Sequence, residues 1–246
     1  MKQIRLSDRL LAIANMVTPG LVAADVGCDH AHLAVYLVQN GICPMVFASD
    51  IHKGPLAKAA ETVRESGLSD KIETILCDGL TGLFGKKVDC VILAGMGGPL
   101  MTEILKAGTP VCEGASEFIL EPQSEPALLR HYLRDNGYRI ISEDMVCEEN
   151  KFYPVMKCVH GVMRMNRECY FRYGKILIKE RHPLLLQYLY TRRKLLKEIY
   201  SGLSEQEASE SVLLRREELS RELSCIEEAL GIMESESPVE IERIIR

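Results

Sequence analysis

Short apolar runs alternate with helical segments through the first 160 residues of this sequence. Five apolar, β-branched runs predict strands: 21–27, 45–51, 71–77, 88–94 and 117–121. Five segments with helical spacing of their apolar residues predict helices: 6–17, 32–40, 55–66, 98–107 and 124–136. Ser124 is expected to cap the last of these helices. Two further runs, 138–147 and 151–159, flank a polar turn and predict a β-hairpin.

Strands that alternate with helices form βαβ units, which build a mostly parallel sheet with helices on both faces. Together with the hairpin, they predict a seven-stranded, Rossmann-like α/β fold. Ligands of such sheets bind outside the carboxyl ends of the strands. We therefore expect the chemistry of this protein at the strand ends.

A different pattern begins after residue 161. Leucine and other apolar residues recur at spacings of three, four and seven in two stripes: Leu185, Leu189, Leu196, Ile199 and Leu203, then Val212, Leu219, Leu223, Ile226, Leu230 and Met233. Such heptad-like stripes predict an antiparallel helical hairpin, a short coiled coil, interrupted by the polar stretch 204–211. The sequence thus predicts two domains, 1–161 and 162–246.

The net charge of −5 conceals an asymmetry between the two predicted helices of the hairpin. Residues 161–200 hold ten lysines and arginines against three glutamates, and residues 201–246 hold five arginines against twelve glutamates. The overall acidity excludes a generic nucleic-acid coat, but a local basic segment is compatible with a nucleic-acid partner. Its residues, Arg192 and Arg193 among them, either follow a phosphate backbone or pair with the acidic helix. The sequence leaves both open.

Nine cysteines are present, with no C-x-x-C pair and an odd total. This usage predicts reduced, buried thiols in a cytoplasmic protein and no metal site. No apolar run approaches the length of about 18–20 residues that a membrane span needs, and the first residues show no signal peptide. We expect neither a membrane partner nor a metal.

Acidic residues follow three successive predicted strands: Asp25 and Asp29 flank the turn after the first, Asp50 ends the second, and Asp78 follows the third. The turn lacks the G-x-G-x-x-G and P-loop patterns that bind pyrophosphate and phosphate. One carboxylate per strand end suits an adenosine-containing ligand without phosphates, and S-adenosylmethionine fits that description. The alternative is that these aspartates cap the following helices.

Glycines crowd the end of the fourth strand, in the run Ala94-Gly95-Met96-Gly97-Gly98-Pro99. Three glycines in four positions indicate a close approach to the backbone, or a tight turn into a helix that Pro99 opens. The fifth strand ends in Glu121-Pro122-Gln123, which adds polar groups to the same edge of the sheet.

Five segments in this order, DVGCDHAHL, SDIHKGPL, CDGL, ILAGMGG and LEPQ, resemble the bacterial tRNA (adenine-22-N1)-methyltransferase family. The resemblance covers nearly the whole chain. It implies a class I methyltransferase domain followed by a helical hairpin. The implied activity is methyl transfer from S-adenosylmethionine to N1 of an adenine, position 22, in the D-arm region of tRNA.

The resemblance also implies roles for individual positions. The cofactor would be held by the turn after the first strand and by the next three strand ends: Asp25, Gly27, Cys28, Asp29, His30, Asp50, Ile51, Asp78, Gly79, Ala94, Gly95 and Met96. The substrate would meet Gly97, Gly98, Pro122, Arg192 and Arg193. His32 stands where the family often has Tyr, a departure that bears on stacking or hydrogen bonding near the cofactor. Glu121 stands where the family often has Gln, a departure that bears on the target more than on the cofactor.

Adenine N1 carries an in-plane lone pair and attacks without losing a proton, so the enzyme mainly has to orient two reactants. The methylated adenine is cationic until N6 loses a proton, and Asp29 and Glu121 are the candidate catalytic carboxylates for that stage. We expect tRNA as partner and a monomer or weak homodimer. Two alternatives remain: a methyltransferase acting on a small molecule, or a non-catalytic cofactor-binding adaptor.

Overall fold

The computed structural model describes residues 4–204 and 209–235. The chain separates into two compact units between Arg164 and Met165, and each unit is described by itself. The middle of the predicted polar stretch 204–211 and the outer ends of both predicted domains lie outside the described residues.

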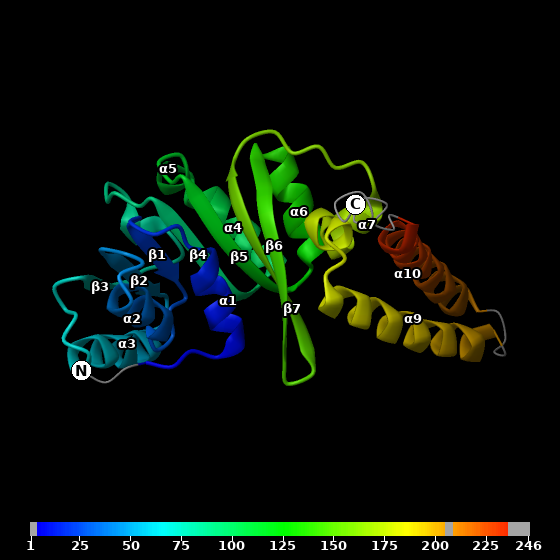
Figure 1. Ribbon diagram of the computed structural model, residues 1–246, viewed down its shortest axis with the longest axis horizontal. Coiled ribbons are helices and arrows are strands. Elements are labelled where there is room, and N and C mark those ends of the chain that lie inside the picture. The colour runs from blue at the N-terminus through cyan, green and yellow to red at the C-terminus, as the bar shows by residue number, and fades with distance from the viewer. Residues whose placement is uncertain (1–3, 205–208, 236–246) are drawn as a thin grey trace, which may run out of the picture. The chain divides into compact units, whose positions relative to one another are not determined.

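The first unit is built on one seven-stranded sheet (Figure 1). Its strands are β1 (Ala23–Val26), β2 (Val46–Asp50), β3 (Ile72–Leu76), β4 (Cys90–Gly97), β5 (Glu117–Ser124), β6 (Tyr138–Glu148) and β7 (Lys151–His160). The order across the sheet is β3-β2-β1-β4-β5-β7-β6. The first five strands pair in parallel, and β7 is antiparallel to both its neighbours. The predicted Rossmann-like fold with a terminal hairpin is confirmed.

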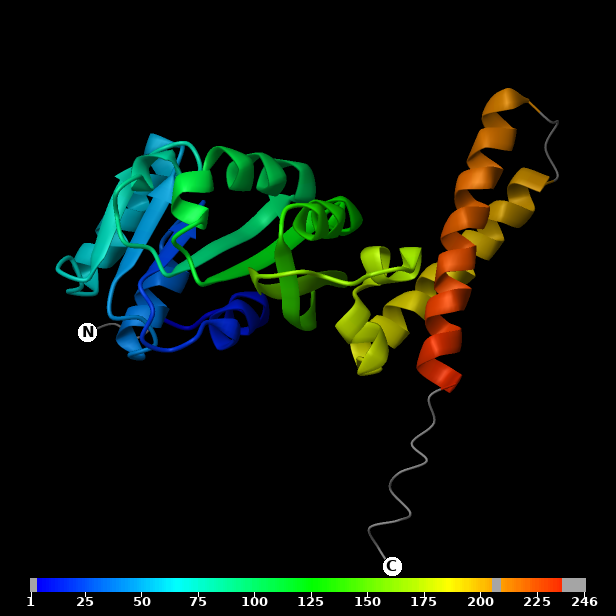
Figure 2. The same cartoon turned by 90° about the horizontal axis from the view of Figure 1, so that it is seen from above.

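Helices cover both faces of this sheet (Figure 2). The helices of the unit are α1 (Asp8–Met16), α2 (His32–Gln39), α3 (Lys53–Glu65), α4 (Gly98–Ala107), α5 (Thr109–Cys112) and α6 (Pro126–Asp135), with a 3-10 turn at Thr81–Leu83. One layer holds α1, α2 and α3, which contact one another in sequence, and the other holds α4 and α6, which contact each other. The short α5 and the 3-10 turn were not predicted.

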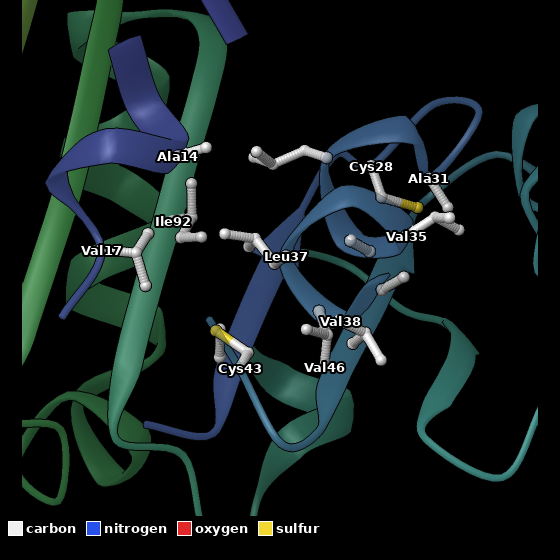
Figure 3. Packing of buried hydrophobic residues seen from close by; sticks show 14 of the residues in the cluster. Ala14, Val17, Cys28, Ala31, Val35, Leu37, Val38, Cys43, Val46 and Ile92 are labelled. Carbon is white, nitrogen blue, oxygen red and sulfur yellow. The ribbon is translucent and has the colours of Figure 1, made fainter. Parts of the chain in front are cut away.

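The core between the first layer and the sheet is aliphatic and closely packed (Figure 3). Leu37 of α2 and Ile92 of β4 are fully buried and point toward one another. All four residues of β1 are buried because the strand lies in the middle of the sheet with both faces covered. Asp25 is the one charged residue among those four, so its burial needs an explanation other than packing.

Strands β4 and β5 run three residues beyond their predicted ends. The register between them shifts around Gly95, which forms an irregularity within β4. Ser124 is the last residue of β5 and does not cap a helix. The prediction of a Ser124 cap is wrong because Glu125, with φ of 49°, makes the turn and Pro126 opens α6.

The second unit contains the predicted antiparallel hairpin, formed by α9 (Pro183–Ser204) and α10 (Glu210–Ser235), which pack together. The buried members of the two stripes form its core: Leu185, Leu189, Leu196, Leu219, Ile226, Leu230 and Met233. Ile199 is exposed, so the stripe of α9 is only partly buried. Two short helices that the spacing did not predict, α7 (Glu168–Tyr173) and α8 (Lys175–Lys179), pack against α10.

Candidate active site

A pocket of about 280 Å³ opens at the carboxyl ends of β1 and β4, beside the first turn of α1. Seven residues predicted from the sequence line it: Asp25, Gly27, Cys28, Asp29, His30, Ala94 and Gly95. Five more come from α1, α2 and the end of β5: Arg9, Leu10, His32, Leu33 and Gln123. The location agrees with the general rule for ligands of parallel sheets.

The turn after β1 is tied to the end of β2. The backbone N–H groups of Gly27 and Cys28 both donate to the carbonyl of Ser49, at 2.8 and 2.9 Å. Gly27 has φ of 74°, and a Cβ there would lie 2.4 Å from Cε of Met96. The positive φ favours glycine at this point, and any larger residue would also displace the end of the flexible Met96 side chain.

Two residues that are not glycine also adopt left-handed backbone conformations in this turn, Asp29 with φ of 46° and Ala31 with φ of 58°. Such conformations cost free energy and concentrate at functional sites. The turn aims Asp29 and His30 at the pocket, with His30 Nε2 3.7 Å from Asp29 Oδ1. The His30 and His32 rings stack at 5.5 Å between centroids, so both imidazoles belong to the pocket wall.

Asp25 brings a carboxylate to the pocket at a buried position. It is 4% exposed, and no described residue donates a hydrogen bond to its Oδ2. Burial raises the pKa of Asp25 to about 7; a hydrogen bond from the Ala34 backbone lowers it, and the nearby Asp50 raises it. A buried acceptor without a donor is expensive. The position therefore suits a ligand that brings a cationic N–H group.

Gly95 and Glu121 meet where β4 and β5 end. The Gly95 N–H donates to Oε2 of Glu121 at 2.7 Å, and Arg9 Nη1 donates to the same oxygen at 2.9 Å. Glu121 is fully buried and is not among the residues that line the pocket. Burial raises its pKa, the Arg9 guanidinium and the Gly95 amide lower it, and Glu148 raises it. Glu121 thus holds the pocket wall together rather than facing the pocket.

The ends of β2 and β3 lie together at the same edge of the sheet, outside the pocket lining. Asp50 Oδ1 accepts a hydrogen bond from the His52 N–H at 2.8 Å, and Ile51 is 56% exposed. Cys77 is the first residue after β3, and its N–H donates to the Asp50 carbonyl; Asp78 and Gly79 come next. The structure therefore brings together, next to β1, the positions after β2 and β3 that the resemblance assigns to cofactor binding.

Met96, Gly97, Gly98 and Pro122 are not among the residues that line the pocket. A Cβ at Gly97 would lie 2.8 Å from Ser124 Oγ, and one at Gly98 would lie 2.5 Å from the carbonyl oxygen of Glu125. Gly98 is thus required where the start of α4 meets backbone at the end of β5, whereas a Cβ on Gly97 would displace only the Ser124 side chain. This favours the tight-turn interpretation of Gly97 and Gly98, and their contact with substrate stays a prediction.

Arg192 and Arg193 belong to the second unit and pair across the hairpin. Arg192 Nε donates to Glu222 at 2.6 Å, and Arg193 Nη1 donates to Glu227 at 3.2 Å. Of the two interpretations that the sequence left open, the structure shows the pairing. Contact of these two arginines with phosphates stays a prediction.

Sequence reasoning missed Arg9 as a site residue and quoted Gln123 only within a motif. Arg9 lies 112 positions before Glu121, and no local spacing connects the two. Gln123 is exposed at the pocket, and its Nε2 would lie 3.7 Å from a Cβ on Gly95. The polar end of β5 was the available signal for Gln123.

Among the described residues, no group of three or more His, Cys, Asp or Glu side chains is arranged to hold a metal ion. No helix within 4–204 and 209–235 is long and apolar enough to cross a membrane. All nine cysteines are free thiols, seven of them buried.

A model of the methyltransferase domain family matches residues 6–156. The tRNA (adenine(22)-N(1))-methyltransferase of Bacillus subtilis is 29% identical over 235 residues, covering 94% of this chain and 99% of the relative. A candidate tRNA (m1A22) methyltransferase of Streptococcus pneumoniae, solved in complex with S-adenosyl-L-methionine, is 30% identical with a TM-score of 0.83, covering 92% of this chain and 100% of the other. TrmK of M. capricolum, solved with S-adenosylhomocysteine, is 26% identical with a TM-score of 0.81. The match covers 93% of this chain and 99% of the other. The chain therefore belongs to the methyltransferase domain family, within its bacterial tRNA (adenine-22-N1)-methyltransferase group.

Proposed function

We propose that this protein transfers a methyl group from S-adenosylmethionine to N1 of adenine 22 in tRNA. The observation that carries the proposal is a pocket at the carboxyl ends of β1 and β4, where one oxygen of the buried Asp25 carboxylate, Oδ2, has no donor among the described residues. Whole-length similarity to proteins named for this reaction supports the target.

The pocket fits the methionine part of S-adenosylmethionine. Its α-ammonium group would supply the donor that Oδ2 of Asp25 lacks. The turn formed by Gly27, Cys28, Asp29 and His30 would surround that part of the cofactor. Bound there, S-adenosylmethionine supplies an electrophilic methyl group on a positively charged sulfur.

The nucleoside part of the cofactor would extend toward the ends of β2 and β3. The Asp50 carboxylate is a candidate acceptor for the ribose hydroxyls, because the hydrogen bond from His52 occupies only Oδ1. Ile51 would cover the ribose, and Asp78 and Gly79 would contact the adenine. Ala94, Gly95 and Met96 would complete the wall next to the methyl group.

The target adenine needs orientation more than it needs a base, because N1 already carries its lone pair. Unstacking a base from folded RNA costs a few kcal/mol, which contacts at the pocket have to offset. Asp29, exposed at the mouth, remains our candidate for stabilising the methylated cationic adenine or receiving its N6 proton. Gly97, Gly98 and Pro122 would contact the target base, as the family resemblance implies.

The second unit is our candidate for binding the tRNA backbone. Exposed cations that no described residue pairs, such as Lys179 and Lys194, are better placed for phosphates than the paired Arg192 and Arg193. Free thiols are compatible with action in the cytoplasm. A monomer or weak homodimer stays a prediction.

The proposal is tested by incubating the protein with unmodified tRNA and S-adenosylmethionine labelled in the methyl group, followed by digestion to nucleosides. We expect the label in 1-methyladenosine, with unlabelled S-adenosylhomocysteine as the other product. Cofactor binding without transfer to tRNA would contradict the proposal and favour a small-molecule substrate or an adaptor. The Asp50→Ala variant serves as the control for cofactor-dependent transfer.

A further inference from the structure

The side chain of Arg9 connects the N-terminal helix to the backbone of β4. Arg9 Nη1 donates to Glu121 Oε2 at 2.9 Å, and that oxygen also accepts the Gly95 N–H at 2.7 Å. Glu121 is fully buried, so water does not replace either donor. Arg9 is in turn held by the Tyr153 ring, 5.5 Å from its Cζ, and by Glu148, 3.9 Å from its Nε. Two hydrogen bonds thus link α1 to the pocket wall.

These bonds set the orientation of the Ala94–Gly95 peptide. In a trans peptide the N–H and the carbonyl point in opposite directions, and this peptide is trans. Because the Gly95 N–H points toward the Glu121 carboxylate, the Ala94 carbonyl points away from that carboxylate, and Ala94 itself lines the pocket. Regular strand pairing does not hold the peptide, because Gly95 has φ of 76° and the β4–β5 register shifts there.

We propose that Arg9 is a positioning residue for methyl transfer, acting through Glu121 to keep the Ala94 carbonyl facing the target adenine. The inference rests on the proposed function and adds to it the residues that orient this acceptor. As N1 forms its bond to the methyl carbon, the bonding electrons of the S–C bond pass to sulfur, and the positive charge moves onto the adenine. Its N6 amino group becomes a stronger donor, and the proton that N6 later loses passes to Asp29 or to solvent. An acceptor oriented beforehand stabilises that charge without reorganisation.

The charge of Arg9 keeps Glu121 a strong acceptor. Burial raises the pKa of Glu121, and Glu148 on β6 raises it further, whereas the Arg9 guanidinium on α1 and the Gly95 amide on β4 lower it. Without Arg9 the carboxyl group would take up a proton at a higher pH. Its bond to the Gly95 N–H would then lose the assistance of a full charge.

The test compares four variants: Arg9→Ala, Arg9→Lys, Glu121→Gln and the double variant Arg9→Ala with Glu121→Gln. Arg5→Ala, an exposed arginine on the same segment, is the matched control. We expect Arg9→Ala to lower kcat on tRNA about 10- to 100-fold while the Kd for S-adenosylmethionine changes less than about twofold, since misplaced groups cost rate rather than ground-state binding. Arg9→Lys recovers part of the loss, and Arg5→Ala changes nothing.

Two readouts separate positioning from a general structural role. The amide resonance of Gly95, observed after selective ¹⁵N-glycine labelling, shifts in Arg9→Ala and Glu121→Gln but not in Arg5→Ala. At saturating cofactor, raising the pH restores kcat in Arg9→Ala, because ionised Glu121 again accepts the Gly95 N–H, and does not restore it in the double variant. Asp25 also titrates, but it is present in every protein compared, so its contribution to the pH dependence of kcat is the same in all of them.

The proposal is overturned by a weakened cofactor Kd with unchanged kcat in Arg9→Ala, which would make Arg9 a cofactor ligand. It is also overturned if the losses in Arg9→Ala and Glu121→Gln multiply in the double variant, because residues acting in one chain are not additive. A wild-type protein that transfers no methyl group to tRNA refutes the proposed function itself. A wild-type protein that does so, with Arg9→Ala equally active, refutes only the positioning role.

Discussion

Replacing Asp25 by asparagine should make the cofactor-free protein more stable while weakening cofactor binding. In the folded protein the pKa of Asp25 is raised from 3.8 to about 7, chiefly by burial. The folded state therefore holds a proton more tightly than the unfolded chain between these values. The free energy of unfolding contributed by Asp25 accordingly falls as the pH rises from about 4 to 7 and stays low above that.

The size of the effect follows from the shift. Each pKa unit corresponds to about 1.36 kcal/mol, so at pH 8 the ionised, buried Asp25 costs about 4 kcal/mol of folding free energy. Asparagine fills nearly the same volume, carries no charge and brings an N–H that pocket water can accept. We expect the free energy of unfolding of Asp25→Asn to exceed that of the wild-type protein by up to about 4 kcal/mol at pH 8 and by close to nothing at pH 4.

Urea denaturation without cofactor at pH 5, 6, 7 and 8 measures this difference. Asp29→Asn is the matched control, because Asp29 lies in the same turn with its side chain 71% exposed. Calorimetry at the same pH values should show the wild-type Kd for S-adenosylmethionine rising about tenfold per unit below pH 7, as Asp25 takes up its proton, and weak pH-independent binding in Asp25→Asn. A stability difference that is flat with pH, or an Asp25→Asn protein less stable at pH 8, would refute the reasoning.

Three further predictions concern the turn, the ribose position and the hairpin. Asp50→Ala should weaken S-adenosylmethionine binding about tenfold or more by calorimetry, through loss of a charged acceptor, and an unchanged Kd would remove Asp50 from the site. Gly27→Ala should lower the free energy of unfolding by about 1–3 kcal/mol in urea titrations, since alanine is forced to a positive φ while the flexible end of Met96 moves aside; full stability would contradict the positive φ at this turn. Lys194→Ala should reduce the salt slope of tRNA binding by about one, and Arg192→Ala should leave it unchanged because Glu222 already pairs that arginine; the reverse pattern would identify Arg192 as the phosphate contact.

The sheet could be predicted from the sequence because its central strands are continuous apolar runs. The same regularity located Asp25, Gly27 and Asp50, since parallel strands bring their carboxyl ends to one edge. The sequence places the ends of β4 and β5 too early because glycine and proline usually end a strand, whereas Gly95 only shifts the register between these two.

Contacts between distant segments could not be read from local patterns. The bond between Arg9 and Glu121 depends on how α1 packs against the end of the sheet, and nothing in the spacing of either residue indicates it. For Gly97 and Gly98 the sequence indicated that another group approaches the backbone closely, but not which group. The structure shows that this group is the turn between β5 and α6. Helices as short as α7 and α8 have too few turns to produce a recognisable period.

The central claim is tested most directly with two unmodified tRNA transcripts that differ only in carrying A or G at position 22. Each is incubated with the wild-type protein and methyl-labelled S-adenosylmethionine, and the label in RNA is counted. Our account predicts label in the A transcript alone. Equal label in both would move the target away from position 22, and no label in either, with cofactor binding measured in parallel, would contradict a tRNA methyltransferase.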